Sequence, residues 1–322
     1  MVITKDSGSN KELIKVGGQA VIEGIMMRAP KTFTVVVRKP DGQLAVREDR
    51  WYSPMERWPT LKKPFLRGCI VLYEALFNGI QALTYSAQEA VGEEEEKLGP
   101  WALAGTIAMA MGAAILLFVV IPHVATLGAG ALFGTDLTVR SLWFHVIDGV
   151  IKVSIFIAYI LLISLMKEIR RVFQYHGAEH KSIHAYEQGE ELTIENARKH
   201  PTLHARCGTA FIMLVLLLSI FLFTAIFPLF PKELFGNKIL TNTVFILVKI
   251  VLLLPIAGLS YEMIRLGDKA NNPVLNILLR PGLWLQRLTT REPSDDQIEV
   301  AIVALKKTLE KEQVWAQEGS SV

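Results

Sequence analysis

The sequence contains only two cysteines, Cys69 and Cys207, among its 322 residues, and almost no excess of charge of either sign. Two cysteines exclude a small secreted scaffold built on several disulfides. The 34 lysines and arginines nearly balance the 31 aspartates and glutamates. The chain therefore lacks the basic field of a nucleic-acid-binding protein, and we expect no nucleic-acid partner. Residues 1–15 also lack an apolar run, so no cleaved signal peptide is expected.

Apolar residues, in contrast, make up 51% of the sequence, and the mean hydropathy is +0.34. A bilayer core about 30 Å thick requires about 20 apolar residues to cross it as a helix. Four stretches meet this requirement: Trp101–Ile121, Trp143–Met166, Cys207–Pro231 and Ile239–Tyr261. The sequence therefore predicts a multi-pass membrane protein, with the lipid bilayer as its first partner.

Lysines and arginines are unevenly distributed between the loops that connect these stretches. Residues 167–206 contain seven of them, whereas the first loop has only Arg140 and the third only Lys232 and Lys238. Short loops rich in Lys and Arg stay in the cytoplasm. We therefore expect the 167–206 loop and both termini to be cytoplasmic. Both cysteines then lie at or near the reducing face, so we expect free thiols.

The regions that flank the apolar stretches predict small soluble parts. Two short β-branched runs, Phe33–Arg38 and Gln43–Glu48, surround the turn residues Pro40–Gly42, which indicates a β-hairpin. Residues 64–88 have the pattern of an amphipathic helix rather than a spanning one. At the other end, Ser294–Gln297 has capping-box spacing ahead of a helical apolar pattern.

The fold class predicted is a membrane α-helical protein with four transmembrane helices. Residues 1–98 would form a cytoplasmic β-hairpin and amphipathic helix, and residues 99–266 the transmembrane domain with its cytoplasmic histidine-rich loop. Residues 267–322 would form a segment lying in the inner membrane interface, followed by a soluble C-terminal helix.

Three charged residues stand inside the apolar stretches. Asp148 and Lys152 are four apart on one helix face, and Lys249 has a comparable depth in the fourth stretch. An isolated charge in hydrocarbon costs at least ~2.5 kcal/mol on insertion scales, so Asp148 is expected to pair with one of the lysines. We favour structural pairing over an ion pathway, because lysines at this depth can extend to water.

Histidines are concentrated in the predicted cytoplasmic loop. Five of the seven lie within 29 residues, namely His176, His180, His184, His200 and His204. If the second transmembrane helix continues inward through residue 187, the first three share one helix face. The segment His176–His180 also matches the H-x-x-E-H pattern. In that pattern two helical histidines bind zinc and the glutamate, here Glu179, polarises a water molecule.

One ion cannot be held by His176, His180 and His184 alone, because the first and third stand ~12 Å apart along the helix. His204 and Cys207 precede the third apolar stretch and offer an imidazole and a thiolate, which suit zinc. Glu262, near the inner end of the fourth stretch, is another candidate. The predicted metal ligands are therefore His176, His180, His184, His204 and Cys207, and the predicted cofactor is Zn or another divalent metal. The alternative is a solvated or phosphate-facing histidine loop.

Several strings in this sequence together resemble one family, the YqhQ-like bacterial membrane proteins. They are Gly17–Arg28 (GGQAVIEGIMMR), Arg67-Gly68, His176–Lys181 (HGAEHK) and Arg206–Thr209 (RCGT). The resemblance extends from about Val16 to the C-terminal helix. Members of this family of unknown function are often labelled metal-dependent enzymes. The resemblance implies a bacterial inner-membrane protein with a His/Glu/Cys site, and it assigns no reaction.

The resemblance draws attention to Glu23 and Arg28, which stand in an otherwise apolar run. A buried acid there needs a partner. One interpretation is an N-terminal strand or turn in which Glu23 pairs with Arg28 or Arg67. The other places Glu23 at the metal site, as a ligand or catalytic base.

Two main hypotheses of function follow. The first is a membrane-embedded metal-dependent hydrolase in which Glu179 activates water and Glu23 is a second catalytic candidate. The second is a non-catalytic accessory factor of membrane-protein biogenesis that binds a translocon, an insertase or a similar complex. A homo-oligomer is compatible with both. An ion transporter ranks last, because four spans form a pore only by oligomerising.

Overall fold

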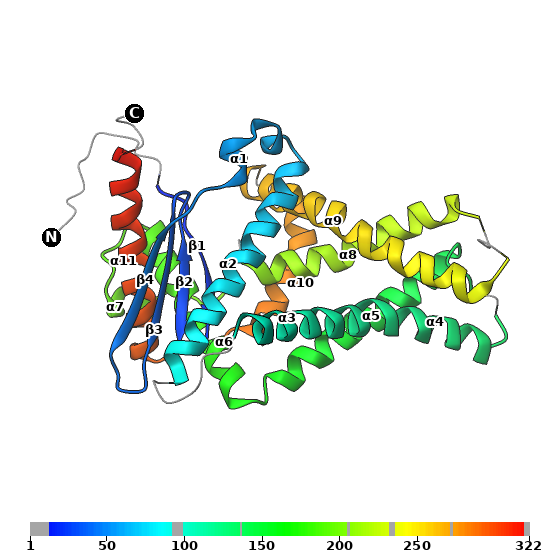
Figure 1. The fold of residues 1–322 in the computed structure, drawn as a ribbon, viewed down its shortest axis with the longest axis horizontal. Helices are drawn as coiled ribbons and strands as arrows, with labels where there is room; N and C mark the ends of the chain where they lie inside the picture. Colours follow the sequence, from blue (N-terminus) through cyan, green and yellow to red (C-terminus); the bar gives the residue numbers. More distant parts are fainter. Residues whose placement is uncertain are drawn as a thin grey trace.

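The computed structural model describes residues 13–91, 99–135, 137–204, 207–231, 236–270 and 273–318. The chain is mostly helical, with a small N-terminal sheet. In Figure 1 the sheet lies at one end of the molecule, and the long apolar helices extend away from it. Arg206, part of one family motif, lies outside the described residues.

The sheet is an antiparallel meander of four strands in the order β1-β2-β3-β4. Its strands are β1 (Gly17–Val21), β2 (Gly24–Arg28), β3 (Thr32–Arg38) and β4 (Leu44–Arg50). The predicted hairpin corresponds to β3 and β4. The glycine-containing run before it forms a second hairpin, because Val21 pairs with Gly24 across a two-residue turn. Glu23 in this turn has a positive φ of 50°.

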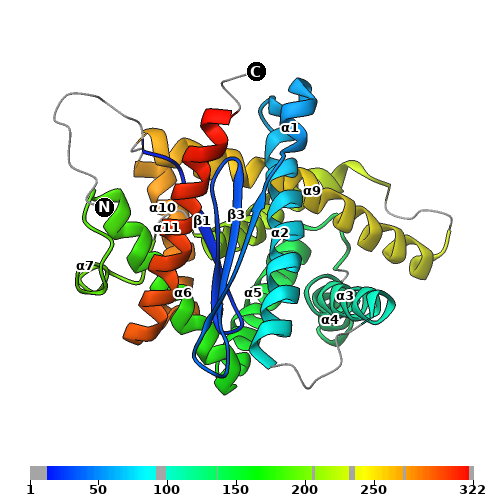
Figure 2. The same cartoon turned by 60° about the vertical axis from the view of Figure 1, so that its left-hand side comes forward.

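Helices cover both faces of the sheet (Figure 2). On one side lie α6 (Lys167–Glu187) and α11 (Asp295–Glu318), and on the other lies α2 (Leu66–Val91). The side chains of β3 alternate between these two cores: Val36 packs with the α6 and α11 residues, whereas Val35 packs toward Ala82 of α2. This is why β3 is buried almost throughout, on both of its faces.

The C-terminal helix is fixed to the sheet by a buried acid. Glu312 of α11 accepts hydrogen bonds from the Lys31 backbone N–H (2.9 Å) and the Thr32 hydroxyl (2.6 Å). At the start of the helix the Gln297 side chain accepts from the Ser294 backbone N–H, which is one arm of the predicted capping box. The N-terminal sheet and the C-terminal helix α11 therefore pack as one unit.

The helix α2 buries several polar side chains, beside Ala82, and exposes many of its apolar ones. Its buried stripe includes Glu74, Asn78 and Ser86, whereas Tyr73 and Leu76 are more than half exposed. Glu74 is satisfied by Arg28 and by the Ser53 hydroxyl. A helix with this orientation is suited to an apolar environment on its outer side.

Four helical segments are long and apolar enough to cross a membrane: Trp101–Leu132, Leu142–Ile163, Gly208–Leu229 and Lys238–Gly267. Each overlaps a predicted span. The first is 11 residues longer than predicted. It comprises α3 (Pro100–Ile115), a π-helical turn η2 (Leu116–Val120) and α4 (Ile121–Leu132). The turn precedes Pro122, which lacks the backbone N–H that a regular helix requires.

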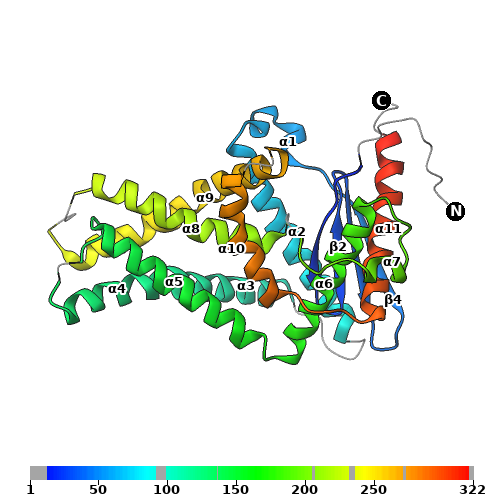
Figure 3. The same cartoon turned by 180° about the vertical axis from the view of Figure 1, so that it is seen from behind.

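The sequence allowed the second apolar helix to continue into the histidine-containing helix, but in the structure the two are separate. The helix α5 (Leu142–Ile163) ends in a turn where the Ser164 hydroxyl bonds the Leu161 carbonyl, and Met166 is extended. Such local bonding competes with helix continuation. The break lets α6 start in a new direction and pack on the sheet (Figure 3).

The bounds of the remaining helical elements follow; among them α8 and α9 form the third and fourth apolar segments. They are α1 (Pro54–Arg57), η1 (Pro59–Lys62), α7 (Ile194–Arg198), α8 (Gly208–Ile226), η3 (Phe227–Leu229), α9 (Lys238–Ala270) and α10 (Pro273–Thr289). The helix α10 packs along α8 and α9 and leads to α11 (Figure 3).

A buried charged cluster joins two of the spans. Asp148 of α5 accepts from Lys152 (3.2 Å) and from Lys249 of α9 (2.9 Å), and all three side chains are almost completely buried. Asp148 thus pairs with both lysines instead of one. The sequence analysis did not single out the two remaining histidines, His123 and His145, which are buried against the nearby Phe144.

Candidate metal centre

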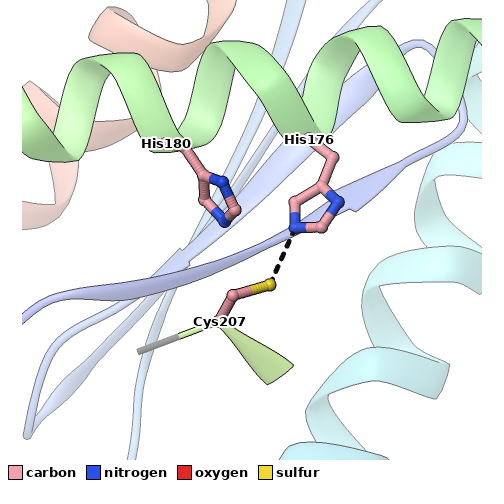
Figure 4. A group of neighbouring side chains, drawn as sticks. All are labelled: His176, His180 and Cys207. Carbon is pink, nitrogen blue, oxygen red and sulfur yellow. Dashed lines mark hydrogen bonds between the residues drawn. The ribbon is translucent and has the colours of Figure 1, made fainter. Parts of the chain in front are cut away.

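The candidate site lies where the second half of α6 is covered by β1, α7, α11 and the chain leading into α8. The predicted four-residue spacing is present in one continuous helix, so the histidines face the same side. Figure 4 shows the rings of His176 and His180 projecting from α6 toward Cys207, which stands at the start of α8. The distant segments 176–180 and 207 are thereby brought together.

One atom each from His176, His180 and Cys207 lies within 4.8 Å of the other two. The His176 Nε2 is 3.1 Å from the Cys207 Sγ, and the ring centroids of the two histidines are 4.4 Å apart. His180 and Cys207 are buried and His176 is half-buried. Two imidazoles and a thiol are a donor set that suits zinc.

Backbone carbonyls orient both imidazoles of this group. The Nδ1 of His176 donates to the Thr289 carbonyl (2.9 Å), and the Nδ1 of His180 donates to the Thr202 carbonyl (2.5 Å). A proton on Nδ1 leaves the lone pair on Nε2, which is the nitrogen available to a metal. Carbonyl partners of this kind are typical of metal-binding histidines.

Glycine in the H-x-x-E-H segment is required by close packing. A Cβ on Gly177 would lie 2.1 Å from the Arg291 backbone carbonyl oxygen. The Arg291 N–H in turn donates to the Phe173 carbonyl (2.9 Å). The absence of a side chain at Gly177 thus lets the end of α10 approach α6, and this approach places the Thr289 carbonyl on His176.

Glu179 lies beside the group, on the face of α6 that contacts β1. Its carboxyl is packed against Gly18, where a Cβ would come within 2.8 Å, and it accepts the Gly18 backbone N–H. Its Oε2 is buried and has no hydrogen-bond partner among the described residues. Burial raises the pKa of Glu179 to about 8, although His176 acts in the opposite direction. A carboxyl with this pKa can exchange a proton near neutral pH.

Burial also sets the ionisation of the two deepest donors. It lowers the pKa of His180 to about 2, with a further contribution from His176, so this imidazole is neutral at physiological pH. It raises the pKa of Cys207, against which hydrogen bonds from Thr209 act. Cys207 also caps the N-terminus of α8, where the helix dipole favours a negative charge.

A second group of potential ligands adjoins the first. His184, Glu187 and His204 each offer a ligand atom within 4.8 Å of the other two. The ring of His204 lies 5.6 Å from that of His180 and 4.7 Å from that of His184, measured between centroids. The structure therefore divides the five predicted ligands between two groups and adds Glu187.

The remaining predicted residues lie elsewhere. Glu23 forms an ion pair with Arg171 and accepts from the Tyr175 hydroxyl, so its partner is neither Arg28 nor Arg67. Glu262 forms an ion pair with Arg67. His200 bonds Glu190 at 3.0 Å. Glu23, Glu262 and His200 therefore belong to neither of the two ligand groups found among the described residues.

Sequence reasoning missed the residues that support the site. Gln286 of α10 is completely buried; its side-chain oxygen accepts from the His204 backbone N–H and its side-chain nitrogen donates to the His204 carbonyl, both at 2.8 Å. Lys181 donates to the Arg198 and His200 carbonyls (3.0 and 2.8 Å). Lys181 belongs to the family motif His176–Lys181, but the motif assigns it no role, and Gln286 is marked only as a polar residue in a largely apolar stretch.

Comparison with known proteins gives a family and no function. A family model described as "Protein of unknown function (DUF1385)" matches residues 63–311. The chain is 33% identical over 315 residues to "Uncharacterized protein YqhQ" of Bacillus subtilis (strain 168), and the match covers 92% of each chain. No solved structure matches the chain.

Proposed function

The chain belongs to this DUF1385 family of unknown function, and on that premise we propose that it is a metal-dependent hydrolase of the bacterial inner membrane. His176, His180 and Cys207 hold the ion, zinc or another divalent metal. The observation that carries the proposal is the orientation of both imidazoles: carbonyls hold each Nδ1, and one atom from each ring lies within 4.8 Å of the thiol.

A catalytic ion is favoured over a structural one by the number of donors. Structural zinc sites are closed by four protein ligands, whereas catalytic sites have three and leave a position for water or substrate. The group offers three donors. Glu179 stands next to it with one buried carboxyl oxygen that has no partner among the described residues, a cost that a structural role alone would not require.

Each residue then has a defined task. The bound ion supplies Lewis acidity and lowers the pKa of water. In its carboxylate form, Glu179 would accept a proton from the attacking water and give it to the leaving group. Gly18 holds the Glu179 carboxyl in place, and the Thr202 and Thr289 carbonyls keep the two imidazoles in the ligating tautomer.

Metal analysis of the purified protein tests the proposal. The full chain is purified in detergent through a tag without histidines, incubated with Zn²⁺, desalted and analysed by mass spectrometry. We expect at least about one ion per chain, and about one ion per chain fewer in a His176→Ala/Cys207→Ser variant. His200→Ala, which removes a neighbouring imidazole outside both groups, is the matched control and keeps the ion. A folded wild-type protein that binds no metal would overturn the proposal.

Catalysis requires a second measurement. Glu179→Gln preserves size and the hydrogen bond from Gly18, so the variant is expected to retain its metal. With a panel of model esters, amides and phosphate esters, we expect hydrolysis by the wild type and a loss of about 100-fold or more in the variant. Equal rates in the two proteins would remove Glu179 from catalysis.

The accessory function stays the second hypothesis, and the same protein preparation distinguishes it. A non-catalytic partner of a translocon or insertase would co-purify with that complex in the absence of bound metal. In either case we propose that the sheet, α6, α10 and α11 face the cytoplasm, because the loop that contains α6 carries the largest number of basic residues.

A further inference from the structure

We propose that His184, Glu187 and His204 hold a second divalent cation, so that the site is a binuclear centre. This inference rests on the proposed function, because the second ion would lie beside the first, on the neighbouring side chains. His184 and Glu187 are three residues apart at the end of α6, and His204 faces them from the segment that precedes α8. Their ligand atoms lie within 4.8 Å of one another.

The two groups are in direct contact. The ring of His204 is stacked obliquely on that of His180, with centroids 5.6 Å apart and an interplanar angle of 38°. The four imidazoles of His176, His180, His204 and His184 therefore form a continuous row, with successive centroids 4.4, 5.6 and 4.7 Å apart. Two ions bound along this row would be held by adjacent imidazoles, as a binuclear hydrolase centre would require.

The supports of the second group resemble those of the first. The Nε2 of His184 donates to the Leu203 carbonyl (2.9 Å), a tautomer that directs the lone pair of Nδ1 to a ligand role. His204 is only 7% exposed, and the buried Gln286 binds both polar atoms of its backbone. Glu187 Oε2 lies 3.3 Å from the His204 Nε2. Because the Gln286 side-chain amide bonds both the N–H and the carbonyl of His204, it fixes the position of that residue.

The donor atoms of the two groups differ in a way that an experiment can use. The first has a thiolate and the second a carboxylate, so the second has the harder ligand set. Two ions side by side can bind both the attacking and the leaving oxygen of one substrate group. The inference therefore predicts a substrate with an ester or amide carbonyl, or a phosphoryl group, whose oxygen can bridge the ions.

Cobalt titration of the metal-free full-length protein tests the second position. Co²⁺ bound to a thiolate gives a charge-transfer absorption in the near ultraviolet, whereas Co²⁺ held by imidazole and carboxylate gives only weak ligand-field bands. We expect about two Co²⁺ per chain, one with and one without the thiolate band. Magnetic coupling between neighbouring ions should weaken the paramagnetic resonance signal of the fully loaded protein.

Two variants assign the positions. His184→Ala/Glu187→Gln should lose one Co²⁺, keep the thiolate band and regain the uncoupled signal, whereas His200→Ala should behave as the wild type. A wild type that binds a single Co²⁺ with the thiolate band, unaffected by the His184→Ala/Glu187→Gln change, would overturn this inference and leave the proposed function intact. A protein that binds no Co²⁺ would overturn both. Thermal unfolding of each variant confirms that it is folded.

Discussion

At the scale of single residues, the site depends on a small number of close backbone approaches. Gly177 is the sharpest case, since a methyl group there would meet a backbone oxygen at 2.1 Å. Alanine is normally the better helix former by about 1 kcal/mol, so any loss of stability in Gly177→Ala must come from packing. The clash is between a Cβ, whose position the backbone fixes, and the backbone oxygen of Arg291, so rotation of a side chain cannot relieve it.

For Gly177→Ala we therefore expect a loss of about 1–3 kcal/mol in the free energy of unfolding, together with weaker metal binding, because the end of α10 carries the Thr289 carbonyl that orients His176. Thermal unfolding in detergent and metal content measure the two effects. Gly105→Ala in α3, where a Cβ meets nothing within 4 Å, is the control and should lose no stability. An alanine at 177 that is as stable and as well metallated as wild type would contradict this account.

At the scale of elements, α5 and α9 are joined by one acid between two lysines. Asp148 is 2% exposed, Lys249 1% and Lys152 5%, so the pairing takes place away from water. Breaking such a buried pair by removing one partner costs about 3–5 kcal/mol. Asp148→Asn leaves two lysines facing each other and should destabilise the bundle by this amount, as measured by unfolding in a denaturing detergent.

The double variant Asp148→Asn/Lys249→Met separates charge pairing from other functions of the aspartate. Removing one lysine with the acid relieves the repulsion, so stability should recover in part, while Lys152 still lacks its acid. If the structural interpretation is right, metal binding at His176 stays unchanged in both variants. Loss of an ion flux with stability unaltered in Asp148→Asn would instead favour the ion pathway.

At the scale of the whole molecule, the features that depend on local composition and spacing could be predicted from the sequence. Contacts between residues on different helices and strands could not. Hydropathy identified the four apolar helices, and the four-residue spacing placed His176 and His180 on one face. The partition of the ligands was not predictable. His204 and Cys207 are three residues apart, yet they serve different groups, because Gln286 fixes His204 on one side while Cys207 caps α8.

The position of Glu23 illustrates the same limit. Its pairing with Arg171 requires the β1–β2 turn to meet α6, which follows only from the fold of the sheet on that helix. The hydropathy pattern also could not predict that α2 exposes its apolar face. The pattern shows that a helix has two faces, and the buried Glu74 and Asn78 show which face the sheet selects.

The arrangement of the molecule also allows its orientation in a membrane to be tested. The sheet, α6 and α11 lie together at one end of the apolar helices, and the end of α4 lies at the other (Figure 1).

In a chain without Cys69 and Cys207, single cysteines are placed at Glu191, beyond α6, and at Phe133, beyond α4; both sites are exposed. We expect a membrane-impermeant maleimide to label Phe133→Cys in cells with an opened outer layer, and Glu191→Cys only after lysis. This expectation rests on the basic residues concentrated in the loop that contains α6, since short loops rich in Lys and Arg stay inside. Labelling of Glu191→Cys in intact cells would reverse the orientation, and the metal centre would then face an oxidising compartment, where a thiol ligand such as Cys207 is no longer protected.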